Sequence, residues 1–199
     1  MFRSLGLAIF VVVAASVAGA YRVASAVPTD STTAQNSAKK VGTMTTPHLV
    51  TVEEKKVVGI ETRTTNRAES SPKTSKIGPL WGRFFAIEGT IPNKSNEKTI
   101  LGVYTKYESD YMGEYSLVIS SEVSSLENVP DGMVGIKIPS AKYLVFTSKG
   151  PMPASLIETW KQIWRYFSNN HEYQRAYTTD FELHDKADQT KVDIYIAVK

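Results

Sequence analysis

The sequence predicts an α+β fold of two tandem βαββ units related by a pseudo-twofold axis, with antiparallel sheets covered by two main helices. Two segments have the apolar spacing of amphipathic helices, and strand-like segments surround both of them. Their order along the chain is strand, helix, strand, strand, and this order occurs twice. Few helices among many neighbouring strands favour antiparallel pairing over the alternating order of a parallel sheet.

The first 26 residues have the features of a secretory signal. Arg3 precedes an apolar or small-residue run over residues 5–20, and small residues end the segment at Ala24-Ser25-Ala26. The run is short for a membrane-spanning helix, which needs about 20 apolar residues. Tyr21 and Arg22 would nevertheless suit the interfacial end of an uncleaved anchor. We therefore expect export to the periplasm or beyond, with cleavage near Ala26 or retention as a membrane anchor.

Composition limits the domain organisation and the kinds of partner and site that the chain can have. Residues 27–47 are rich in Ser, Thr, Ala and Asn and poor in large apolar side chains, which predicts a flexible linker before a domain over 48–199. Both basic residues of the leader contribute to the net charge of +3, so the rest of the chain is nearly neutral and offers no electrostatic case for nucleic acid. Without cysteine, and with His48, His171 and His184 widely spaced, we expect no disulfide, metal or cofactor.

The two helices are expected over Pro72–Ile87 and Pro153–Phe167. Their apolar stripes consist of Ile77, Leu80, Trp81, Phe84 and Phe85 in the first, and of Ile157, Trp160, Ile163, Trp164 and Phe167 in the second. Each stripe needs a sheet to cover it. The expected strands are Val57–Thr65, Thr99–Tyr107, Glu114–Val123, Met133–Ile138, Lys142–Ser148, Tyr177–His184 and Val192–Val198.

Short segments of the two halves resemble each other in the same order. Trp81-Gly82-Arg83-Phe84-Phe85 matches Trp164-Arg165-Tyr166-Phe167, and after a loop Tyr104-Thr105-Lys106-Tyr107-Glu108 matches Thr178-Thr179-Asp180-Phe181-Glu182. This order predicts that the chain arose by duplication. It also pairs Glu108 with Glu182.

Glu182 is the main candidate for a charged site. Strand alternation places it on one face with Asp180 and His184, opposite Phe181. If that face is open to solvent, Glu182 is an ordinary surface acid. If it lines a groove between the units, Glu182 would attract a cationic ligand, and Glu108 would face the same groove as its counterpart.

Aromatic side chains are the candidate walls of such a groove. Trp81 and Trp164 occupy matching helix ends, and Tyr104 and Tyr143 combine an apolar ring with a polar tip. All four also fit a packed core. A nucleophile elbow, a phosphate loop and a zinc helix motif are all absent from the sequence, which argues against the familiar hydrolytic devices.

Several segments resemble the gyrase-inhibitor-like effector-binding domains of AraC-type regulators, in particular the integron-cassette group. The matching segments, in family order, are residues 57–66, 80–84, 103–111, 141–146, 160–163 and 175–182, and they cover nearly all of residues 48–199. The resemblance implies a ligand groove at the junction of the two units that takes amphipathic, often cationic compounds. It also implies that Glu182 marks the floor of this groove. His184 departs from the tyrosine that is common in the family.

The resemblance leaves three functions open. The first is an exported module that binds a small organic ligand, with Glu182, Trp81, Tyr104, Glu108, Tyr143 and Trp164 as ligand-binding residues. The second is a small-molecule hydrolase in which Glu182 or Glu108 activates water. The third is a protein-interaction inhibitor, as the family name suggests. The chain shows no helix-turn-helix pattern, so direct DNA contact is not expected.

Overall fold

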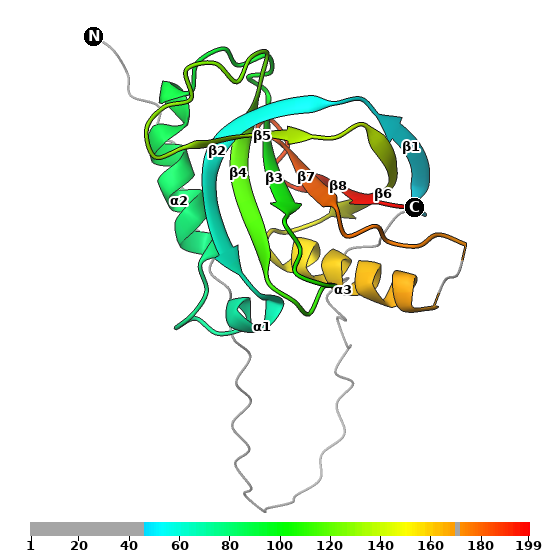
Figure 1. The fold of residues 1–199 in the computed structure, drawn as a ribbon. Helices are drawn as coiled ribbons and strands as arrows, with labels where there is room; N and C mark the ends of the chain where they lie inside the picture. The colour runs from blue at the N-terminus through cyan, green and yellow to red at the C-terminus, as the bar shows by residue number, and fades with distance from the viewer. Residues whose placement is uncertain (1–45, 170–171) are drawn as a thin grey trace, which may run out of the picture.

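The strands form one antiparallel sheet in the computed structural model, which describes residues 46–169 and 172–199 (Figure 1). The strand order is β1-β6-β8-β7-β3-β4-β2-β5. The strands are β1 (His48–Val52), β2 (Lys55–Thr64), β3 (Thr99–Thr105), β4 (Tyr115–Val123), β5 (Val134–Ile138), β6 (Ala141–Lys149), β7 (Thr179–Asp185) and β8 (Lys191–Ala197). The helices are α1 (Asn66–Glu69), α2 (Ile77–Ile87) and α3 (Ala154–Asn169), with a 3₁₀ turn η1 (Glu88–Thr90) after α2.

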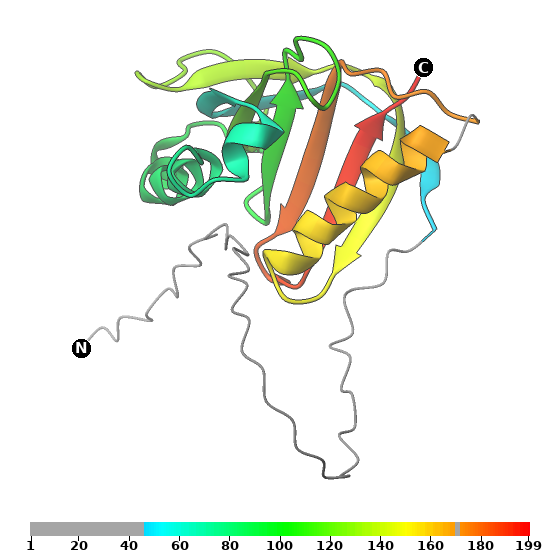
Figure 2. The ribbon, with the colours of Figure 1, turned by 90° about the horizontal axis from the view of Figure 1, so that it is seen from below.

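Both long helices lie on the same face of the sheet, over different strands. Helix α2 packs on β2 and β4, whereas α3 packs on β6. Figure 2 shows β3 and β7, the two central strands, between the helices. The side chains that β3 and β7 present to this face therefore lie in the space between α2 and α3.

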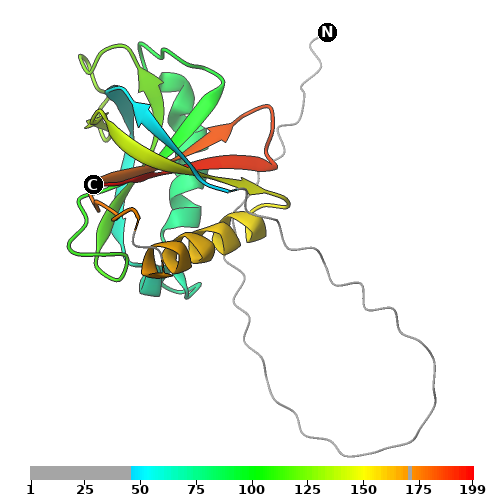
Figure 3. The ribbon, with the colours of Figure 1, turned by 90° about the vertical axis from the view of Figure 1, so that its right-hand side faces the viewer.

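The core has separate parts on the two faces. Beneath α2 lie Leu117 and Ile119 with Phe84, and beneath α3 lie Phe146 and Ile194 with Ile163. On the other face the sheet curves strongly (Figure 3), so that residues of the edge strands β1 and β5 pack on one shared cluster. That cluster contains Val103, Tyr143, Phe181 and their neighbours, all away from the helices.

The α+β class is confirmed, and each expected strand is present with ends within two residues of the expected ones. The expected antiparallel sheets form one continuous sheet, because β3 pairs with β7 and joins the two halves. Strand β1 was not expected. The order strand, helix, strand, strand occurs as β2-α2-β3-β4 and β6-α3-β7-β8, and the pseudo-twofold axis stays a prediction.

The first long helix begins later than expected, at Ile77 instead of Pro72. The chain first forms the short helix α1, and the carboxylate of Glu69 at its end accepts hydrogen bonds from the backbone N–H groups of Lys76 (3.0 Å) and Ile77 (3.2 Å). These bonds satisfy N–H groups that a helix start leaves without partners. Phe85 and Ile157, which were expected on the buried stripes, are exposed instead.

None of the helices within residues 46–169 and 172–199 combines the length and apolar character that crossing a bilayer requires. The expected leader, residues 1–26, and nearly all of the expected linker, 27–47, lie outside the described residues, as does His171.

Candidate ligand-binding site

Glu182 lies at the centre of the sheet, on the face that carries the helices. It is on β7, directly opposite Gly102 of β3, and its neighbour on the other side is Ile194 of β8. Only 3% of its surface is exposed. A buried carboxylate is costly unless hydrogen bonds or charges compensate it, so its partners define the site.

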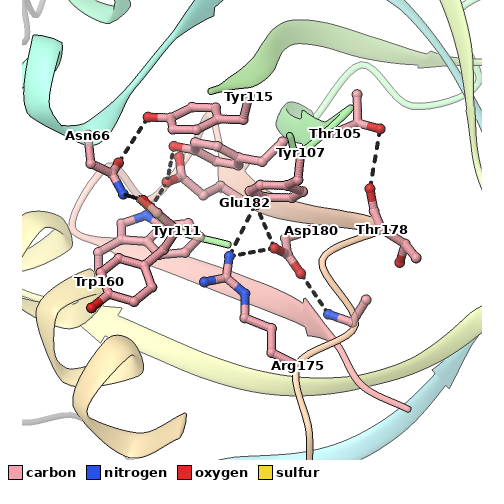
Figure 4. Close-up of polar contacts among 12 residues, drawn as sticks. Asn66, Thr105, Tyr107, Tyr111, Tyr115, Trp160, Arg175, Thr178, Asp180 and Glu182 are labelled. Atoms are coloured by element: carbon pink, nitrogen blue, oxygen red, sulfur yellow. Dashed lines mark hydrogen bonds and ion pairs between the residues drawn. The ribbon is translucent and has the colours of Figure 1, made fainter. Parts of the chain in front are cut away.

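Three side chains from different elements hold the carboxylate of Glu182. The hydroxyl of Tyr104 on β3 donates to Oε1 at 2.8 Å. The indole Nε1 of Trp160 on α3 donates to the same oxygen at 2.6 Å (Figure 4). The other oxygen, Oε2, lies 2.8 Å from Nε2 of His184. Within the described residues, His184 is the one basic side chain at ion-pair distance, and neither Lys nor Arg pairs with Glu182.

Aromatic rings surround these polar contacts. The ring of Trp81 on α2 meets the imidazole of His184 edge to face, with centroids 4.8 Å apart. On the other side, the Tyr104 ring contacts Trp160 at 5.1 Å and Tyr115 at 5.6 Å. Both helices and the central strand thus contribute a ring to one cluster around a carboxylate.

Gly102 makes room for the carboxylate. A Cβ atom at this position would lie 3.3 Å from Oε2 of Glu182 and 3.7 Å from Cδ1 of Ile119. Because facing side chains of paired strands approach closely, a larger residue at 102 would press on the acid. The sequence of β3 therefore leaves space for the side chain that β7 supplies.

A second buried acid lies on the same face, but it is neutralised. Asp180 accepts hydrogen bonds from Arg175 Nη2 at 2.6 Å, from the Tyr107 hydroxyl at 2.7 Å and from the Ala197 backbone N–H at 2.8 Å. Figure 4 shows Arg175 and Tyr107 converging on it. The guanidinium carbon of Arg175 also lies over the ring of Tyr177, 4.5 Å from its centroid. Asp180 is thus paired with an arginine, whereas Glu182 is not.

The comparison with protein families decides the classification. A family model described as Cass2, integron-associated effector binding protein, matches residues 48–198. The chain belongs to the Cass2 family. This agrees with the resemblance to effector-binding domains found in the sequence.

Individual relatives are similar to this chain in sequence or in fold. The integron cassette protein VCH_CASS2 of Vibrio cholerae is 33% identical, with a TM-score of 0.68 over 78% of this chain and 97% of that protein. The Bacillus subtilis protein YobU, named as a transcriptional regulator, is 28% identical over 76% of this chain and 97% of its own length. The solved structure of SAV2435 is 22% identical, with a TM-score of 0.64 over 78% of this chain and 94% of that one, and is similar in fold.

In this Cass2-family site the tyrosine donors stay protonated. Burial, and then the negative charge of Glu182, raise the pKa of Tyr104 well above its usual range. Burial and the charge of Asp180 do the same to the pKa of Tyr107, although Arg175 opposes them. An uncharged phenol is the form that donates a hydrogen bond to a carboxylate. Glu182 is therefore held by dipoles rather than by a fixed cation.

The structure gathers some of the expected site residues and separates others. Trp81 and Tyr104 lie in the cluster around Glu182. Glu108 does not, because it lies in the exposed loop after β3, where its carboxylate accepts from the Glu114 backbone N–H at 3.1 Å. Tyr143 is fully buried on the opposite face of the sheet, against Phe181.

Trp164 is one helical turn away from the position that contacts Glu182. Its ring stacks on Tyr111 of the β3–β4 loop, at 5.5 Å between centroids and 19° between planes. The tryptophan that contacts Glu182 is Trp160, which the sequence analysis had placed only in the apolar stripe of the helix. The contact of His184 with Glu182 and the Arg175–Asp180 pair were missed as well. Strand alternation had placed positions 180, 182 and 184 on one face, but it could not say which of them touch.

Proposed function

We propose that this protein captures a small amphipathic organic cation outside the cytoplasm, with Glu182 as the counter-charge and Trp81, Tyr104 and Trp160 as aromatic walls. One observation carries the proposal: the carboxylate of Glu182 is buried among rings and held by Tyr104 and Trp160, without a lysine or arginine within the described residues. A carboxylate held by uncharged donors keeps its attraction for a cation that enters from outside.

The surrounding rings suit the same ligand class. An organic cation gains from contact with the faces of Trp and Tyr rings, by about 0.5–2 kcal/mol for each contact. Its apolar parts gain from leaving water. SAV2435, which has this fold, was solved bound to tetraphenylphosphonium, a cation surrounded by aromatic groups. That compound is therefore a suitable first probe for this chain.

The decisive variant is Glu182→Gln, which removes the charge and keeps the shape. We expect tetraphenylphosphonium to bind the full-length Glu182→Gln protein about 30-fold more weakly or worse, since losing a buried charge partner costs about 2 kcal/mol or more. Isothermal titration calorimetry would give the Kd, and circular dichroism would show that the variant is folded.

Glu108→Gln is the matched control, because it removes one carboxylate from the exposed loop after β3. We expect its Kd to equal that of the unaltered chain. Equal affinities of the Glu182→Gln and unaltered proteins would overturn the role of Glu182. A strong loss in Glu108→Gln would instead restore the two-carboxylate hypothesis.

Export is the second part of the proposal and is supported by the leader-like residues 1–26. We expect the full-length chain, produced in a bacterium, to be recovered from the periplasmic or secreted fraction, or from the membrane if the leader is retained. A variant lacking residues 1–26 should stay in the cytoplasm. Fractionation followed by immunoblotting would measure both, and a cytoplasmic full-length chain would refute export.

A further inference from the structure

His184 stands out among the partners of Glu182 because its charge can change. Its Nε2 lies 2.8 Å from Oε2, while its side chain is 23% exposed and that of Glu182 only 3%. Tyr104 and Trp160, the other two partners of this carboxylate, stay uncharged. Histidine is the side chain that ordinarily gains a proton between about pH 8 and about pH 5. The site can therefore hold a net negative charge or none.

Among the described residues, Glu182 is the one ionisable side chain at hydrogen-bonding or ion-pair distance from His184. On α2 the contacting side chain is the Trp81 indole. The residues opposite His184 on the adjacent strands are Ile100 of β3 and Val192 of β8. Farther along, Lys186 pairs with Glu88. A proton on His184 therefore acts mainly on Glu182.

We propose that His184 controls the affinity of the site for an organic cation: uncharged, it leaves the carboxylate of Glu182 to the cation, and protonated, it takes the place of that cation as the ion-pair partner. This inference rests on the proposed function. Protonated His184 and the ligand compete for one carboxylate. Protonation of His184 and binding of the ligand therefore weaken each other by the same factor. Affinity for a cation then rises with pH through the range in which the imidazole loses its proton.

The test is the Kd of tetraphenylphosphonium for the full-length protein at two pH values. We expect about tenfold weaker binding at about pH 5.5 than at about pH 7.5, from the competing positive charge. In His184→Gln the ratio of the two Kd values should fall to about 2 or less, whatever the affinity at the higher pH. His184→Asn serves as a second variant if the first does not fold.

His48→Gln is the matched control, since His48 is exposed on β1 and far along the sheet from β7. It should keep the full pH dependence. Calorimetry in two buffers of different ionisation enthalpy adds a second readout: at a pH between the two values of the test, the ligand should release protons from the unaltered chain and not from His184→Gln, by the same linkage.

The outcomes separate this inference from the proposed function. Absence of binding at either pH would overturn the proposed function and, with it, the role of His184. Binding that depends on Glu182 but has the same pH ratio in the unaltered and His184→Gln proteins would overturn the role of His184 alone. Loss of the pH dependence in His184→Gln, with retention in His48→Gln, would support it.

Discussion

Replacing Arg175 with Ala is expected to lower the free energy of unfolding by about 3–5 kcal/mol, the usual cost of removing one member of a buried ion pair. The Arg175 and Asp180 side chains are 4% and 0% exposed, and their nearest charged atoms lie 2.6 Å apart. Without the guanidinium, Asp180 would keep only the Tyr107 hydroxyl and the Ala197 N–H as donors. Urea denaturation followed by circular dichroism would measure the change.

Arg165→Ala is the control, because Arg165 pairs with Glu158 at 3.0 Å but its side chain is 64% exposed. Exposed pairs contribute at most about 1 kcal/mol, so this variant should stay close to the unaltered chain. An Arg175→Ala protein as stable as Arg165→Ala would mean that Asp180 is not held as a charged group by its arginine.

Gly59→Ala is expected to destabilise the protein by about 3 kcal/mol, at the upper end for adding an atom to a packed interior. A Cβ atom at Gly59 would lie 1.9 Å from the carbonyl oxygen of Ile119 and 2.6 Å from the Cα atom of Ser120. Both are backbone atoms of β4, so the two strands would have to separate where they pair. Thermal or urea denaturation would measure the loss.

The contrasting glycine is Gly82, on the exposed side of α2, where an added Cβ would meet nothing within 4 Å. Alanine favours a helix interior over glycine by about 0.8–1.0 kcal/mol, so Gly82→Ala should raise stability. If both variants lowered stability equally, the close approach of β2 and β4 at Gly59 would not be the cause.

Local patterns in the sequence predict nearly all helices and strands. Each of these segments has an apolar face to bury, and its own alternation or helical spacing shows that face. The start of α2 could not be predicted in this way, since it depends on the Glu69 carboxylate reaching two N–H groups seven and eight residues ahead. Nor could the single sheet, which depends on the long-range pairing of β3 with β7.

The sequence predicted only the part of the site that depends on side-chain alternation within one strand. Alternation along β7 places Glu182 opposite Phe181, and the structure has Phe181 in the core away from the helices. Whether Trp160 or Trp164 contacts Glu182 depends on how α3 is rotated and placed over the sheet. A local sequence pattern does not determine this. Tyr143 lies away from Glu182 because β6 turns its other face toward α3, a consequence of pairing with β8.

The continuous pairing of β3 with β7, from Thr99 opposite Asp185 to Thr105 opposite Thr179, has a consequence for selectivity. It anchors the acid to a hydrogen-bonded platform that cannot widen without breaking the ladder. The indoles above it come from helices packed on other strands, so we expect the helices, rather than the sheet, to adjust to ligands of different size. We therefore expect the site to discriminate between ligands by their charge more strongly than by their size.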